Sequence, residues 1–128
     1  MWPFTTFGFF SVVQDRQNKS RLVVRARVRL DLERLHQFIP TLSRPVVSET
    51  TDYRYRAWVR RDDFAAAMPS LVAQITYPNF KNEVCRQQGV KRMQVYHKVW
   101  DVMLQLQMQE QSDRILHKAL APAKKRKA

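Results

Sequence analysis

Glycine is almost absent from this sequence, which has two glycines, Gly8 and Gly89, among 128 residues. A glycine-rich phosphate loop and a dinucleotide-binding fingerprint each need several glycines within a few positions, because the backbone must approach a phosphate group closely. Two distant glycines can build neither motif. The sequence therefore excludes the nucleotide-dependent enzymes that use them.

Cysteine is scarcer still, since Cys85 is the only one. A single cysteine forms no disulfide within the chain, which indicates a reducing compartment and predicts a cytoplasmic protein. The three histidines, His36, His97 and His117, show no spacing typical of metal ligands, alone or with Cys85. We therefore expect no metal and no cofactor, and we interpret Cys85 as a buried, inert thiol.

Residues arranged for catalysis are also lacking. His97 and Asp101 are spaced as an i,i+4 pair on one helix, and such a pair is typically structural. Asp62 and Asp63 stand just before a predicted helix, where acidic residues usually cap the helix or interact with its dipole. We expect that the protein is not an enzyme.

Long apolar runs are missing as well. No run approaches the roughly 18 residues that a membrane span needs. The apolar segment from Phe4 to Val13 lacks a basic lead and a small-residue cleavage pattern, so we do not predict a signal peptide. The sequence predicts a protein with no membrane partner.

Acidic residues are few, and their scarcity leaves a strong positive charge. The chain has 23 basic and 11 acidic residues, a net charge of +12 at pH 7. Without the four basic residues near the C-terminus the net charge is still +8, so most of it belongs to the folded part. A positive field of this size attracts polyanions. The four residues are Lys124, Lys125, Arg126 and Lys127.

The composition predicts a folded chain of one domain. Hydrophobic residues make up 45% of it and aromatic residues 11%, enough for a core without disulfides or metals. We interpret residues 1–120 as a single α+β domain and residues 121–128 as a basic, disordered tail.

Two segments alternate as strands do, with apolar side chains on one face and arginines on the other. In residues 53–60 the expected core side chains are Tyr53, Tyr55, Ala57 and Val59. In residues 22–30 they are Leu22, Val24, Ala26, Val28 and Leu30. An earlier strand is predicted near residues 8–13.

Helical patterns fill much of the remaining chain. Asp31 is predicted to cap a helix that ends before Pro40, and Asp62 or Asp63 to cap a second one, which Pro69 should bend or split. A third helix is predicted to begin with Pro78 as its first helical residue and to stop near Gly89.

The last long helix is predicted over residues 91–111, with a short helical turn after Ser112. Its apolar residues lie on more than one side, which suggests that it packs between elements or against a second chain. We expect Trp100 to be a core aromatic. Together these elements predict an α+β fold, an antiparallel sheet of three to four strands with helices packed on one face and a long C-terminal helix.

The second face of the predicted sheet suggests a binding surface. Arginines around an aromatic ring suit an anionic partner that carries flat rings, so we expect a nucleic-acid-binding module, with single-stranded RNA or DNA favoured. Phe10 and Val12 are expected to join this face. The predicted nucleic-acid-binding residues are Arg25, Arg27, Arg29, Arg54, Arg56, Trp58 and Arg60, with Lys124, Lys125, Arg126 and Lys127 of the tail.

A second hypothesis from a different class remains open. The chain would then be a small interaction or inhibitor protein that docks its basic surface on an acidic or nucleic-acid-binding partner, a larger protein or a ribonucleoprotein complex. A further alternative is that the face binds nothing, because helices cover it and its arginines pair with Glu33, Glu49 or Asp52.

Several short motifs resemble a set of small bacterial proteins that have no established activity. The resemblance covers most of the chain up to about residue 106, and Pro3 departs from it because those proteins usually open Met-Trp-Ile-Phe-Thr. It implies a compact single domain and transfers no function. The matching motifs are Gly-Phe-Phe-Ser-Val-Val at residues 8–13, Val-Arg-Ala-Arg at 24–27, Asp-Tyr-Arg-Tyr-Arg at 52–56, Tyr-Pro-Asn-Phe-Lys at 77–81 and Val-Tyr-His-Lys-Val-Trp at 95–100.

Overall fold

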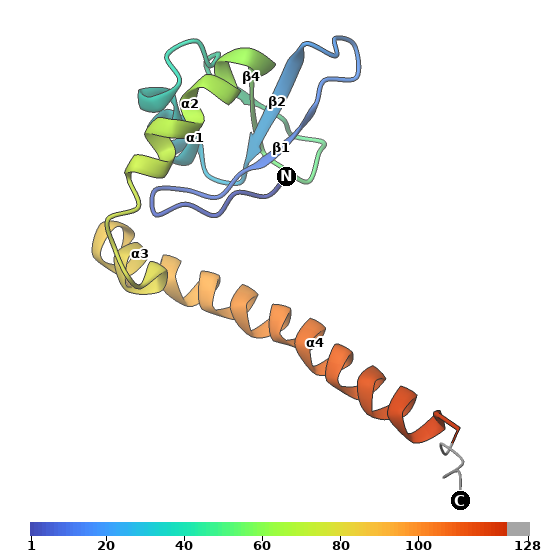
Figure 1. Cartoon of the computed structure of the whole chain (residues 1–128). Coiled ribbons are helices and arrows are strands. Elements are labelled where there is room, and N and C mark those ends of the chain that lie inside the picture. Colours follow the sequence, from blue (N-terminus) through green and yellow to red (C-terminus); the bar gives the residue numbers. More distant parts are fainter. Residues whose placement is uncertain (123–128) are drawn as a thin grey trace, which may run out of the picture.

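A four-stranded antiparallel sheet, in the order β1-β2-β4-β3, forms the centre of the body of the protein in a computed structural model (Figure 1). The structure describes residues 1–122, so the basic residues predicted at positions 124–127 lie outside it. The predicted α+β class, the antiparallel sheet and the long C-terminal helix are confirmed. The elements are β1 (Ser11–Gln14), β2 (Arg21–Ala26), α1 (Arg29–Phe38), β3 (Val46–Val47), β4 (Tyr55–Arg60), α2 (Arg61–Ala73), α3 (Phe80–Gln88) and α4 (Val90–Leu120).

One face of the sheet forms the core. Val12 of β1 lies opposite Val24 of β2, which in turn lies opposite Ala57 of β4, so the three side chains share one row. Helices α1 and α2 pack on this face and contribute Leu32 and Phe64, among others, to the same buried cluster. Because strand side chains alternate, the arginines of β2 and β4 point to the other face.

The strand register corrects one prediction about β1. Phe10 and Val12, expected on the arginine face, are buried in the core with 1% and 6% of their surface exposed. Ser11 and Val13 lie instead opposite Arg25 and Val23 of β2. A shift of one residue moves every side chain of a strand to the other face, and alternation alone does not fix that register.

The second strand is shorter than predicted. β2 ends at Ala26, and Arg29 is the first residue of α1, where its Nε donates to Glu33 at 3.0 Å. Arg29 is therefore not part of the arginine row, and Val28 and Leu30 are exposed rather than buried. The alternation of apolar residues and arginines in the sequence continues past Ala26. The strand itself ends there, because the chain turns to place α1 on the core face of the sheet.

The predicted helix starts were also wrong. α1 and α2 each begin one or two residues before the acidic residues expected to cap them, and neither has a side-chain cap. α3 begins at Phe80 rather than at Pro78, and the side chain of Asn79, its N-cap residue, accepts a bond from Asn82 N at 3.0 Å. Pro69 lies inside an unbroken α2. Gly89 has a φ of 91°, which favours glycine, and separates α3 from α4 as predicted.

Asp31 joins α4 to the rest of the protein. Its carboxylate is 1% exposed and accepts two parallel bonds from the Arg92 guanidinium, at 2.8 and 2.9 Å, and a third from Phe9 N at 3.0 Å. The bond to Asp31 raises the pKa of Arg92 above its usual value. Gly8 permits this arrangement, since a Cβ there would lie 2.8 Å from the Asp31 Cβ. A residue predicted to cap a helix is thus a buried anchor.

α4 is longer than predicted and mostly unpacked. It is one helix of 31 residues, and the turn expected after Ser112 is part of it. Tyr96 packs into the body, but every residue from 101 to 120 is exposed, and Figure 1 shows this part projecting away from the sheet. Trp100 is 55% exposed and contacts the His97 ring and the Lys81 ammonium, so the expected core position is wrong. None of the helices in the described part of the chain is long and apolar enough to cross a membrane.

The anchor gives a stability prediction. Arg92→Ala leaves the Asp31 carboxylate buried with only the Phe9 N–H, so we expect the free energy of unfolding to fall by about 3–5 kcal/mol in chemical denaturation. Arg86→Ala is the control, because Arg86 is exposed where it pairs with Glu83, and we expect almost no change. Equal effects of the two substitutions would contradict the role given to Asp31.

Candidate functional site

An open groove of about 630 Å³ runs along the arginine face of the sheet. Its lining comes from β1, β2, β4 and the loops beside them, and none of the lining residues belongs to a helix. The groove thus leaves the arginine face accessible to a ligand. The lining residues are Val13, Gln14, Asp15, Arg16, Gln17, Arg21, Val23, Arg25, Thr51, Arg56 and Trp58.

Like charges lie opposite each other on the two neighbouring strands β2 and β4. β2 and β4 place Arg25 directly opposite Arg56 and Arg21 directly opposite Arg60, and the pair of Val23 and Trp58 lies between them. Directly opposed like charges destabilise an antiparallel pair of strands. The fold tolerates two such pairs on one face, and Asp15 offsets the charge of Arg21 in one of them. An anion between Arg25 and Arg56 would offset the repulsion in the other.

Two arginines of the groove hold buried donors that have no acceptor. Among the described residues, the Nε atoms of Arg25 and Arg56 are the buried side-chain polar atoms without a hydrogen-bond partner. Arg25 is held from one side, where its Nη2 donates to Ser11 Oγ at 2.7 Å. A buried donor without an acceptor costs free energy, and an anionic oxygen is the acceptor that suits a guanidinium best. The two donors lie on the arginine face of the sheet, on neighbouring strands.

Tyr53 is buried as predicted, but its ring packs against arginines of the sheet instead of the main core cluster. It precedes β4, and its ring lies 4.8 Å from the Arg25 guanidinium carbon and 4.6 Å from that of Arg27. Arg27 also donates to the Asp52 carbonyl at 2.8 Å. Cation–π contact holds the guanidinium groups in place without neutralising their charge.

One acidic side chain lies in the groove. Asp15 forms an ion pair with Arg21, and it also accepts a bond from Gln17 N at 2.9 Å. The Gln17 N–H, with help from Arg21, holds the pKa of the Asp15 carboxyl below its usual value, so Asp15 is ionised at neutral pH. It neutralises Arg21, whose guanidinium carbon also lies 5.9 Å from the Trp58 ring. Of the arginines that line the groove, Arg16, Arg25 and Arg56 therefore have no ion pair with a described acidic residue.

The structure brings together part of the predicted set. Arg25, Arg56 and Trp58 line the groove, and Arg60 lies beside it opposite Arg21. Arg16 and Arg21 were missed, although extending the strand alternation by one step would have found Arg21.

Other predicted residues have partners of their own. Arg54 lies 3.9 Å from Glu49 at an exposed position, and Arg29 pairs with Glu33 outside the sheet. Pairing with Glu33 and Glu49 was one of the alternatives considered for the arginines. His97 and Asp101 form the expected i,i+4 pair, with 3.4 Å between His97 Nε2 and Asp101 Oδ2. Cys85 is half-buried rather than fully buried.

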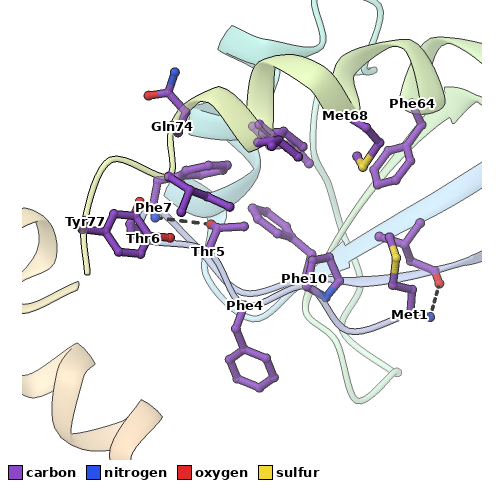
Figure 2. Close-up of a pocket in the computed structure, with 16 residues that line it drawn as sticks. Met1, Phe4, Thr5, Thr6, Phe7, Phe10, Phe64, Met68, Gln74 and Tyr77 are labelled. Atoms are coloured by element: carbon purple, nitrogen blue, oxygen red, sulfur yellow. Dashed lines mark hydrogen bonds between the residues drawn. The ribbon is translucent and has the colours of Figure 1, made fainter. Parts of the chain in front are cut away.

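A smaller apolar cavity of about 220 Å³ lies between the N-terminal segment and α2. Figure 2 shows Phe64 and Met68 of α2 above it and Phe10 below. The Thr5 hydroxyl beside it is already satisfied, since it donates to Gly8 O at 2.8 Å and accepts from Gly8 N at 2.9 Å. The cavity therefore has little polar chemistry with which to orient a ligand.

Comparisons with protein-family models, with curated proteins and with solved structures find no match to this chain.

The opposed arginines predict an unusual effect of substitution on stability. Arg56→Gln removes one charge from a like-charged pair and keeps a polar side chain, so we expect the free energy of unfolding at low salt to stay the same or rise by up to about 1 kcal/mol. Chemical denaturation at low and high salt would measure this, and salt should reduce any gain. A large loss of stability would show that Arg56 holds the fold together.

Proposed function

We propose that this protein is a non-enzymatic nucleic-acid-binding module that uses the groove of the sheet face, with a single strand of RNA or DNA favoured as the ligand. The observation that carries the proposal is the pair Arg25 and Arg56, which face one another with buried Nε donors that lack an acceptor. A phosphate group supplies both the charge and the acceptors that this pair needs.

The order of groups along the groove favours a nucleic acid over an isolated anion. An arginine pair, the Trp58 ring and a second arginine pair follow one another along β2 and β4. Two residues of a strand span roughly 7 Å, so charge and ring alternate at that step. A single strand likewise alternates phosphates with bases that are free to stack on an aromatic side chain. A duplex, whose bases are already stacked, would use only the arginines.

The net charge supports the same ligand. A charge of +12 attracts a polyanion from a distance and speeds encounter with it. Each phosphate contact then releases counterions, which makes affinity depend on salt.

A second candidate is the interaction or inhibitor protein that docks a basic surface on an acidic or nucleic-acid-binding partner. The observation that favours it is that little aromatic surface is free for bases to stack on. Trp58 is half-buried, and Tyr53 is buried beneath arginines. Carboxylates of an acidic protein would satisfy the Nε donors of Arg25 and Arg56 as well as phosphates do.

Salt dependence tests the proposal directly. We expect labelled single-stranded oligonucleotides to bind more tightly than duplexes of the same length, with log affinity falling linearly against log salt in fluorescence anisotropy. A slope near zero, or no binding at low salt by protein purified free of nucleic acid, would overturn the proposal. Binding to an acidic protein in its place would favour the second candidate.

A double substitution tests the site. Arg56→Gln with Arg60→Gln removes one arginine from each opposed pair, and we expect about tenfold weaker binding or more, since each arginine loses a charge-assisted bond. The control, Arg86→Gln with Lys98→Gln, removes the same charge from exposed positions on α3 and α4 and should change affinity by about twofold at most. Equal losses would mean that net charge, rather than the groove, binds the ligand.

A further inference from the structure

The projecting part of α4, residues 101–120, exposes apolar side chains that no other part of the described chain covers. Val102, Leu106, Leu116 and Leu120 are 57–73% exposed. An exposed helix of this length is about 30 Å long and gains nothing from tertiary packing. Large exposed apolar surfaces of this kind mark interaction sites.

The spacing of these four residues suits a helical partner. With Gln109 and Asp113 they occupy positions 102, 106, 109, 113, 116 and 120, which alternate steps of four and three. This heptad pattern places all six on one stripe, as in a coiled coil. The stripe has apolar residues at both ends and two polar residues in the middle.

The charge of the same segment favours a second copy of this chain. Asp101, Glu110 and Asp113 are opposed by Arg114 and Lys118, so residues 101–120 carry a net charge of −1 with His117 neutral. Residues 1–100 carry +9 and residues 121–128 carry +4, which together with −1 give the total of +12. The projecting helix is thus the segment that two copies can bring together without strong repulsion.

We propose that two copies of this chain pair antiparallel through residues 102–120 of α4, with residue 111 of one helix at the same height along the pair as residue 111 of the other. In this register Val102 meets Leu120 of the second copy, Leu106 meets Leu116, and Gln109 meets Asp113. Each layer then matches apolar with apolar or polar with polar, and a Gln amide can donate to an Asp carboxylate.

A parallel pair would not achieve this match. It would place each Asp113 against the same residue of the second copy, and a pair of like charges in the seam is costly. The antiparallel register brings the two Glu110 side chains near each other at the edge of the seam, where each is already paired with Arg114 of its own helix at 2.6 Å. It also keeps the two positively charged bodies at opposite ends of the paired helices.

Sedimentation velocity of the full chain over a range of concentrations tests the pairing. We expect a species of twice the 15.3 kDa mass of one chain. Leu106→Glu with Leu116→Glu should convert it to a monomer, because both substitutions place charges in the seam. The control, Leu104→Glu with Ile115→Glu, makes the same kind of change on the opposite side of α4 and should leave the dimer intact.

A thiol cross-linker tests the orientation, with Cys85→Ser as the background. Ser112→Cys places its two thiols beside the two-fold axis of the antiparallel pair, so a short bis-maleimide should join them. Leu120→Cys places them about 27 Å apart, beyond the reach of the reagent. Cross-linking at position 120 but not 112 would overturn the register. A monomer at all concentrations would overturn the proposal and leave the stripe to a different partner.

Discussion

The buried carboxylate of Asp31 is the constraint on which the rest of the structure depends. A charge this far from water is stable only with partners, and Asp31 finds them in Phe9 N and the Arg92 guanidinium. Because these three residues belong to the N-terminal segment, to α1 and to α4, one ion pair joins parts of the chain that lie far apart in sequence. The pairing fixes the base of α4, and with it the direction in which the helix leaves the body.

The sheet separates stability from binding because its side chains alternate between two faces. Val24 and Ala57 hold the core, with none of their surface exposed, while Arg25 and Arg56 on the opposite face are spared any role in that core. The groove can therefore hold opposed like charges at a cost that the core tolerates. Because of this division, the sheet can carry electrostatically unfavourable arginine pairs without any loss from its core.

Much of the fold could be predicted from the sequence, whereas the details of the site could not. Periodicity located the strands that carry Arg25 and Arg56, because a period of two survives even where the ends of a strand are uncertain. It failed for Phe10, whose register depends on pairing with β2, and for Asp31, whose role depends on an arginine 61 residues away. It also failed for Trp100, because the apolar pattern of a helix is the same whether its apolar side chains face a core or project into solvent.

The two unusual features of the molecule are complementary in charge and position. The body is positively charged and holds arginines in an open groove, and the projecting helix is nearly neutral and exposes apolar side chains. A helix that carried the charge of the body could not associate with its own copy, and a body as apolar as the helix could not attract a polyanion. An antiparallel pair would hold two grooves at opposite ends of one assembly. Two weak sites joined in this way bind a long polyanion more tightly than either alone, because the second contact becomes intramolecular.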